Sequence, residues 1–245
     1  MKPLLACAFQ PIVHESGNVY AYEELMRFKG HPDQSPLPLI RHWEKSGYIE
    51  TVDLMMVDVV CPAVMTAAWK PRIAINVSVR TIEAAGSEYV AKLASLASIT
   101  QHLVIEVTET AKISNATLFL QFIKGCRDCG YHIALDDCEP GHPFAFPGFL
   151  QSIRPSIVKV DGLFFRNSIR TGAIDALLGL IYTAHRSQAR VIIEHVSSVE
   201  HRNRAFAYGA DFVQGYETGS PGQLPICTFG EQTVNWGTNK NGRFV

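Results

Sequence analysis

Polar side chains close several short apolar runs of this sequence. The run "YHIALDD" ends in two adjacent carboxylates, Asp136 and Asp137, and other runs end near Asn76, Glu106 and Glu194. Two neighbouring carboxylates that lack a partner repel each other, and one of them is driven toward its protonated form. A positive charge is therefore expected beside the aspartate pair, unless the pair lies open to water.

The ligand types in this set favour a hard divalent cation. Together with Glu23, these residues offer carboxylate and amide oxygens, and no histidine or cysteine spacing typical of zinc accompanies them. Mg²⁺ or Mn²⁺ suits such ligands. If a strand ends at Asp136, Asp137 can turn inward, and the two carboxylates can serve neighbouring metals. Two metals about 3.5–4 Å apart suit displacement at a phosphodiester, because they activate water and stabilise both oxygens.

The elements that must position these residues are strands that alternate with helices. From about residue 70, six apolar runs rich in β-branched residues are separated by helical patterns, and "CAFQPIV" and "VYAYEELMR" precede them. This alternation indicates a parallel sheet. Eight strands in 245 residues predict a TIM-like (β/α)8 barrel. An open doubly wound sheet is the alternative, but no GxGxxG phosphate loop follows any of the runs.

Strand parity predicts that the polar residues share one end of this barrel. Side chains alternate along a strand, so each polar residue shares a face with the apolar residue two positions before it. The pairs are Asn76 with Ala74, Glu106 with Val104, Asp136 with Ala134, Lys159 with Ile157, and Glu194 with Ile192. One such residue alone usually caps a helix or faces water. A whole inward-facing set would be costly to bury unless cations accompanied it.

Composition bounds the class of protein. The formal net charge of −1 gives no electrostatic footprint for duplex nucleic acid or for an anionic membrane. No apolar stretch approaches the ~18–20 residues that cross a bilayer, so no membrane insertion is expected. We interpret the six cysteines as reduced and expect a cytoplasmic protein. One domain should span 1–245, with the Gly- and Asn-rich stretch 223–245 as a surface tail.

Taken in order, the motifs resemble those of the EAL-domain phosphodiesterases, which hydrolyse cyclic di-GMP. The resemblance extends from "AFQPIV" to "QGYETGSP", which is most of the chain. The Glu-Ala-Leu signature and its following arginine look like Glu23-Glu24-Leu25-Met26-Arg27. The other matching motifs are "INVS" with Asn76, "EVTE" with Glu106 and Glu109, the Asp136-Asp137 pair, "VKVD" with Lys159 and Asp161, Glu194, and "VQGY" with Gln214.

The resemblance implies a barrel with an irregular, partly antiparallel start and a metal-dependent reaction with linear pGpG as its product. Two Mg²⁺ or Mn²⁺ ions would bind Glu23, Asn76, Glu106, Asp136, Asp137 and Glu194. Lys159 and Gln214, with Glu194, would form the catalytic set that positions the attacking water. Arg27 would hold a phosphate of cyclic di-GMP, Gln10, Leu25, Asp161 and Pro221 would help form the substrate site, and Glu109 would anchor a loop. A homodimer and control by a separate regulatory protein are further expectations.

The chain also departs from the family pattern. Glu24 replaces the signature alanine, His195 replaces a glycine, and Ser197 replaces a glutamate. Cys138-Glu139-Pro140 stands where the family reads roughly Phe-Gly-Thr after the aspartate pair, in a loop about two residues longer before Lys159 by our alignment. We expect a working but slow enzyme. The alternatives are a cyclic di-GMP receptor with little turnover and a protein-binding regulatory module.

Overall fold

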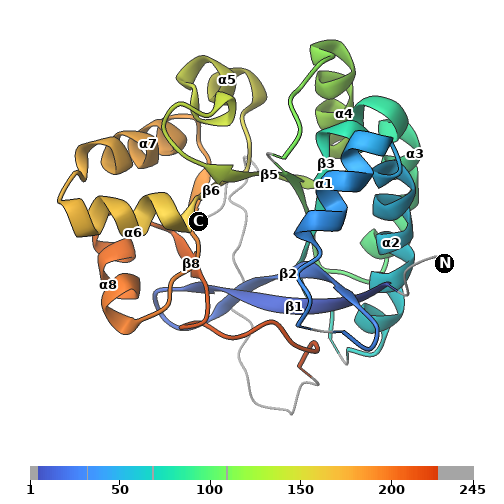
Figure 1. The fold of residues 1–245 in the computed structure, drawn as a ribbon, viewed down its shortest axis with the longest axis horizontal. Coiled ribbons are helices and arrows are strands. Elements are labelled where there is room, and N and C mark those ends of the chain that lie inside the picture. The colour runs from blue at the N-terminus through green and yellow to red at the C-terminus, as the bar shows by residue number, and fades with distance from the viewer. Residues whose placement is uncertain (1–4, 32, 68, 109, 226–245) are drawn as a thin grey trace, which may run out of the picture.

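Eight strands close into a barrel in the computed structural model of this chain, which describes residues 5–31, 33–67, 69–108 and 110–225 (Figure 1). Neighbouring strands follow chain order around the barrel. β1 runs antiparallel to both of its neighbours, β2 and β8, and every other pair is parallel. The strands are β1 (Leu5–His14), β2 (Val19–Phe28), β3 (Ile73–Ser78), β4 (Leu103–Thr108), β5 (His132–Cys138), β6 (Ile157–Val160), β7 (Arg190–Ile193) and β8 (Phe212–Gln214). The predicted TIM-like barrel with an antiparallel start is confirmed.

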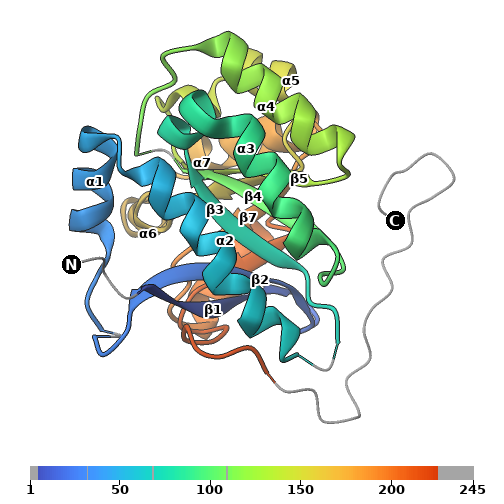
Figure 2. The ribbon, with the colours of Figure 1, turned by 90° about the vertical axis from the view of Figure 1, so that its right-hand side faces the viewer.

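Helices cover the outside of the parallel part of the barrel. In Figure 1, α1 to α4 lie on one side of the strands and α5 to α8 on the other, while Figure 2 shows α2 and α3 in front of β3 and β4. The helices are α1 (Leu37–Ser46), α2 (Ile49–Met65), α3 (Val79–Ala97), α4 (Ala116–Asp128), α5 (Pro147–Ile153), α6 (Gly162–Thr171), α7 (Asp175–Arg186) and α8 (Val199–Ala207), with a short 3₁₀ helix, η1 (Pro143–Ala145).

A small apolar cluster fills the barrel interior beneath the polar residues. It contains the face partners that strand parity predicted, and residues of β1, β2 and β8 complete it. The members are Ile12, Ala21, Ala74, Val104, Ala134, Ile157, Ile192 and Phe212. Because side chains alternate, the next inward positions toward the carboxyl ends of β3 to β7 are the polar ones. The interior floor is thus sealed, and the polar side chains form a layer above it.

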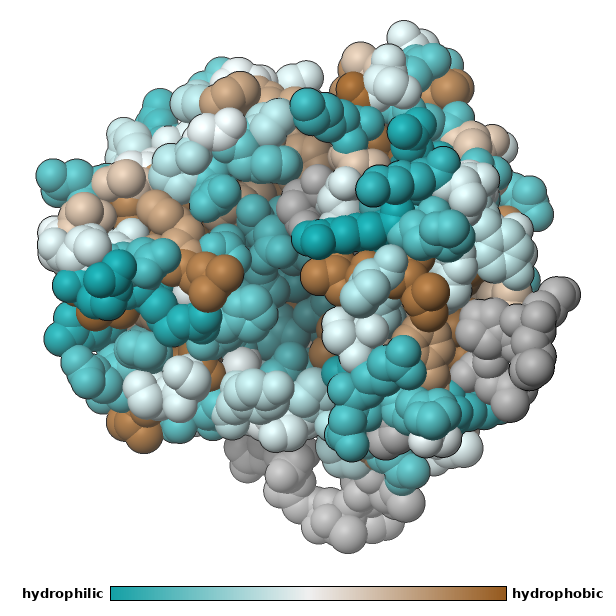
Figure 3. All heavy atoms as spheres, viewed as in Figure 1, coloured by the Kyte–Doolittle hydropathy of each residue, from teal (hydrophilic) through white to brown (hydrophobic). Residues whose placement is uncertain are grey.

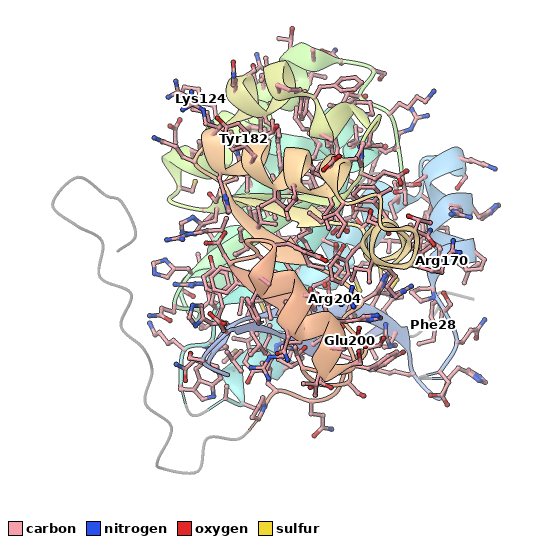
Figure 4. All side chains as sticks on the ribbon, turned by 90° about the vertical axis from the view of Figure 1, so that its left-hand side faces the viewer. Phe28, Lys124, Arg170, Tyr182, Glu200 and Arg204 are labelled. Atoms are coloured by element: carbon pink, nitrogen blue, oxygen red, sulfur yellow. The ribbon has the colours of Figure 1, made fainter. Side chains whose placement is uncertain are left out.

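The outer surface is mostly polar where the helices face water. On α8, Glu200 and Arg204 form an i,i+4 ion pair of 2.8 Å (Figure 4). Such exposed pairs contribute little to stability. None of the helices in the described part of the chain combines the length and apolar character needed to cross a membrane.

The segment after β8 packs back against the barrel. Phe9 and Gly222 exchange two backbone hydrogen bonds of 2.7 and 3.0 Å, and Leu224 is buried in the outer core. The start of the expected tail, 223–225, therefore adjoins the fold. The rest of the tail, 226–245, lies outside the described residues.

Candidate active site

The ammonium group of Lys159 occupies the centre of an acidic cluster inside the mouth of the barrel. Its Nζ lies 2.7 Å from Glu106, 2.8 Å from Asp136, 2.9 Å from Glu194 and 3.3 Å from Glu23. Lys159 and Glu106 are completely buried, and Glu23 and Glu194 nearly so. Five residues that are far apart in the sequence thus meet at one point. We call them the acidic centre.

Neighbouring strands deliver these side chains to the same level. Asn76 of β3 pairs in register with Glu106 of β4, so the two strands carry them side by side. The Asn76 amide donates to Glu23 at 3.0 Å, and the Gln214 amide of β8 donates to the other Glu23 oxygen at 2.6 Å. Glu23 is therefore held from both sides. Asn76 and Gln214 thus border the acidic centre and fix one of its carboxylates.

A β-bulge brings both aspartates toward the site. Between Leu135 and Cys138, β5 advances three residues while its partner β6 advances two, from Val158 to Val160. Asp137 takes a left-handed φ of 45°, which aspartate tolerates better than most residues. The strand does not end at Asp136, which was the condition considered from the sequence, because β5 continues to Cys138. The bulge nevertheless re-aims the pair, as bulges next to active sites do.

Electrostatics show how much negative charge is confined here. Burial alone would raise the pKa of Glu23, but Lys159 and the Asn76 and Gln214 amides outweigh burial and lower it. Burial, opposed by Lys159, raises the pKa of Asp136 to about 6, and burial raises the pKa of Glu194 well above its ordinary value. One ammonium therefore does not offset the burial of all of these carboxylates, and further positive charge at this position would be favourable.

The donor set fits a divalent cation. Oxygens of Asp136, Asp137 and Glu194 all lie within 4.8 Å of one another. Glu106 Oε1 and Glu194 Oε2 are buried and have no hydrogen-bond partner. Buried carboxylate oxygens normally have partners, and hard oxygens in this number are what Mg²⁺, Mn²⁺ or Ca²⁺ accepts. These residues could therefore hold a cation beside Lys159. The Lys159 ammonium itself supplies part of the positive charge that was expected near the aspartate pair.

A groove of about 770 Å³ lies beside the carboxyl end of β2. Arg27 and Pro221 line it, together with Lys29 and the exposed Tyr216. Figure 3 shows a hollow near the middle of this view, with many hydrophilic residues on its left and hydrophobic residues at its right-hand rim. The Arg27 guanidinium donates to the Met26 carbonyl at 2.8 Å. Two basic side chains and an aromatic ring suit a ligand that combines phosphate with a flat base.

Other residues of the expected substrate site occupy different positions. Gln10 Nε2 donates to the Gly219 carbonyl at 3.0 Å, and Gln10 Oε1 accepts from Gln214 at 3.4 Å, so Gln10 connects the segment after β8 to Gln214. Leu25 is half-buried. Asp161 caps α6 by accepting from the Phe164 amide at 2.6 Å, which gives it a structural role. Glu109 lies outside the described residues.

The loop after the aspartate pair is ordered by its own residues. Cys138 is completely buried, so a larger side chain there would clash with the core. Pro143 and Pro147 begin η1 and α5, positions at which the missing N–H is not needed. Phe144 is buried and stacks on Phe149. The prolines thus start helices, and the loop is anchored at both ends.

His195 occupies a strained position next to the acidic centre. It has a left-handed φ of 51°, and its side chain covers Gly162 at the start of α6. A Cβ on Gly162 would lie 2.4 Å from His195 Cβ, so only glycine fits there. His195 is exposed, and Ser197 is 3.4 Å from a ring nitrogen of His201. Neither side chain is among the ion-pair partners of Lys159, which are Glu23, Glu106, Asp136 and Glu194.

Glu24 faces away from the barrel interior into a buried pocket of carboxylates. It is 2% exposed, and its Oε1 has no hydrogen-bond partner. Burial, the neighbouring Glu23 and Asp53 raise the pKa of Glu24 to about 8. At neutral pH the Glu24 side chain is therefore mostly protonated, and it adds little charge beside Glu23.

We expect Glu24→Gln to stabilise the metal-free protein increasingly as the pH rises from about 4.5 to about 8. Across that window the unfolded state releases a proton that the folded state keeps, so the free energy of unfolding of the wild type falls with pH. Glutamine does not titrate, so the free energy of unfolding of the variant does not fall with pH for this reason. Urea unfolding at several pH values measures the difference, with the exposed Glu88→Gln as control. If the difference in free energy of unfolding between Glu24→Gln and the wild type does not change with pH, the prediction is contradicted.

Sequence reasoning overlooked two buried carboxylates behind the acidic centre, Glu44 and Asp53. Their hydrogen bonds go to Ser78, the last residue of β3. The only local signal was Ser78 itself, two residues after Asn76 in "INVS". Nothing in the sequence near residues 44 and 53 indicates that α1 and α2 reach this strand end.

The fold and the site define a TIM-like barrel with an acidic centre at the carboxyl ends of its strands, the place where such barrels build active sites. Comparison with known families makes the assignment more specific. The chain belongs to the EAL domain family, whose profile matches residues 3–221.

Curated relatives share this domain at modest identity. The cyclic di-GMP phosphodiesterase PdeF of Escherichia coli K12 is 27% identical over 224 residues, which cover 88% of this chain and 30% of PdeF. The cyclic di-GMP phosphodiesterase PdeB of Shewanella oneidensis is 31% identical over 163 residues, which cover 65% of this chain and 19% of PdeB. The chain thus spans less than a third of the length of these relatives.

Solved structures agree in fold. The FimX EAL domain of Pseudomonas aeruginosa bound to c-di-GMP has a TM-score of 0.75 at 20% identity and covers 90% of this chain and 92% of that one. The PaMucR phosphodiesterase in complex with c-di-GMP has a TM-score of 0.73 at 24% identity, with 89% and 92% covered. These likenesses establish the barrel and its strand order.

Proposed function

We propose that this chain is a metal-dependent phosphodiesterase that hydrolyses cyclic di-GMP to linear pGpG. The observation that carries the proposal is the acidic centre, where four carboxylates from different parts of the barrel surround Lys159. Family membership and the names of the curated relatives support the substrate. Because those relatives are much longer, the substrate is part of the proposal.

The carboxylates and Asn76 are proposed to hold two Mg²⁺ or Mn²⁺ ions. The ligands would be Glu23, Asn76, Glu106, Asp136, Asp137 and Glu194. When bound, such ions lower the pKa of water and stabilise charge on the phosphoryl oxygens. Glu106 Oε1 and Glu194 Oε2 already lack competing hydrogen bonds, so these oxygens need not break a contact to bind.

Lys159, Glu194 and Gln214 are proposed to position the attacking water. The Lys159 ammonium cannot accept a proton, and its contacts with four carboxylates fix it in place. If a bound cation draws one of these carboxylates away, one of its three N–H groups would be free to donate a hydrogen bond to the water or to a phosphate oxygen. Arg27 is proposed to hold the second phosphate from the groove, and Gln10, Leu25, Asp161 and Pro221 to support the nucleotide around it.

The test is to incubate the purified chain with cyclic di-GMP and either Mg²⁺ or Mn²⁺, and to separate the products. We expect linear pGpG, formed only when metal is present and suppressed by a chelator. Tight binding without product would instead indicate a receptor. Absence of both binding and product would indicate a protein-binding module. A homodimer and a separate regulatory protein are proposed as well, and light scattering during the assay tests the first of these.

A further inference from the structure

Glu44 connects two neighbouring strand ends behind the acidic centre. One of its oxygens, Oε1, accepts hydrogen bonds from Ser78 Oγ at 2.7 Å and from Thr110 Oγ1 at 2.6 Å. Ser78 is the last residue of β3, and Thr110 lies two residues beyond the end of β4. A side chain of α1 thus ties β3 to the connection that leaves β4.

Asp53 of α2 reinforces the same strand end. Its Oδ2 accepts from the Ser78 backbone amide at 3.0 Å and from the Thr81 hydroxyl at 2.5 Å. Tyr89 of α3 adds a hydrogen bond of 3.1 Å from its hydroxyl to the Asn76 carbonyl. Three helices therefore hold Asn76 and Ser78 of β3 through buried polar groups.

Buried carboxylates without a basic partner are unusual in a protein core. Glu44 and Asp53 are 7% and 6% exposed, yet within the described ranges neither forms an ion pair with a basic side chain. Burying a carboxylate without a cation is costly, and burial raises the pKa of Asp53 to about 7. A carboxylate can, however, accept from donors on several elements at once, which an apolar side chain cannot do.

The position of these contacts connects them to the site. Asn76 and Glu106 are paired in register on β3 and β4, and Ser78 pairs with Thr108 two residues further along. The Glu44 contacts thus lie just beyond the two side chains that enter the acidic centre from adjacent strands. Errors of about 1 Å in such positions can cost ~10²-fold in rate. The hydrogen bonds of Glu44 at the strand ends limit such errors in the positions of Asn76 and Glu106.

We propose that Glu44 is a positioning residue, whose carboxylate holds the ends of β3 and β4 so that Asn76 and Glu106 enter the acidic centre together. This inference rests on the proposed function, because it assumes that the acidic centre binds metal. Residues that orient metal ligands from behind typically contribute 10–100-fold to metal affinity or activity. Glu44 touches neither substrate nor metal in this scheme.

The experiment compares Glu44→Ala with Glu44→Gln. Alanine removes both hydrogen bonds, whereas the glutamine amide oxygen can still accept from both hydroxyls. We expect Glu44→Ala to weaken Mn²⁺ binding about 10–100-fold by calorimetry without substrate, and to lower kcat at fixed Mn²⁺. The KM for cyclic di-GMP at saturating Mn²⁺ should stay near wild type, and Glu44→Gln should recover most of the lost Mn²⁺ affinity.

Glu83→Ala is the matched control. Glu83 also accepts hydrogen bonds at the far end of the β4–α4 connection, from the amides of Ser114 and Asn115 at 2.6 and 2.7 Å and from the Ser114 hydroxyl. Glu83 lies five residues after Ser78 in the sequence, but among the described residues its hydrogen bonds go to Ser114 and Asn115 and not to Ser78 or Thr110. Its loss should lower the melting temperature without changing Mn²⁺ affinity.

Several outcomes would overturn the inference. Glu44→Ala with wild-type Mn²⁺ affinity and only a lower melting temperature would show a purely structural role. If Glu44→Ala does not fold, Thr110→Val removes one donor at nearly constant volume, and unchanged Mn²⁺ affinity there decides against the inference. A wild type that binds Mn²⁺ but hydrolyses nothing would refute the proposed function alone. A wild type that binds no Mn²⁺ would refute both.

Discussion

Asp136→Asn is expected to lower kcat for cyclic di-GMP hydrolysis by ~10²-fold or more, because the amide removes one negative ligand from the proposed metal site. Asp136 lies 2.8 Å from Lys159, and its oxygens lie near those of Asp137 and Glu194. Asparagine has nearly the same shape, so the fold should persist. Product formation under saturating Mg²⁺ or Mn²⁺ measures the effect, and calorimetry with Mn²⁺ should show weaker binding.

Asp128→Asn provides the control for this change. Asp128 lies on the outer face of α4, where it pairs with Lys124 at 2.6 Å in an exposed i,i+4 contact. The same chemical substitution there should leave turnover unchanged, since exposed pairs contribute little. Near-full activity of Asp136→Asn, in a protein whose control behaves as expected, would remove the basis for metal binding at the aspartate pair.

Lys159→Met is expected to lower kcat by ~10²-fold or more while weakening cyclic di-GMP binding far less, because the ammonium is proposed to act on the attacking water. A second effect follows from its position. Lys159 is fully buried among four carboxylates, and removal of one partner from a buried charged group typically destabilises by about 3–5 kcal/mol. The metal-free variant should therefore unfold at lower urea concentration than the wild type.

Added Mn²⁺ should narrow this stability gap, because a cation in the acidic centre replaces part of the missing positive charge. Lys92→Met is the matched control, since Lys92 pairs with Asp58 at 2.8 Å on the surface of α3 and should tolerate methionine. If the affinity for cyclic di-GMP falls by the same factor as kcat, Lys159 mainly binds a phosphate of the substrate, and its proposed role on the attacking water is wrong. An unchanged stability without metal would contradict the electrostatic argument.

The loop that follows the aspartate pair packs around its own residues. Replacement of Cys138 by phenylalanine, the family residue, would place a large ring where a buried thiol fits. The loop must therefore be exchanged from Glu139 onward to test whether it slows the enzyme. Glu139 is exposed, and His142 folds back to accept from the Phe144 amide. Both features favour a loop adapted to its own residues.

The sequence by itself determined the strand count, the strand faces and most of the acidic centre. These follow from a local rule, because alternation along a strand places Asn76, Glu106 and Lys159 above Ala74, Val104 and Ile157 whatever the rest of the chain does. Closure of parallel strands then brings their carboxyl ends to one rim. The fold class and the gathering of the polar residues were predictable for that reason.

Only the tertiary structure decided the features that depend on contacts between distant elements. The bulge that redirects Asp137 is a shift in the register between β5 and β6, and a sequence pattern with a period of two cannot show the extra residue. The central position of Lys159 depends on four other strands, and the ties from Glu44 and Asp53 depend on where α1 and α2 pack. The burial that keeps Glu24 protonated is likewise set by those helices. Local residue patterns fix which side a residue faces, whereas its neighbours across the fold fix its partners and its charge.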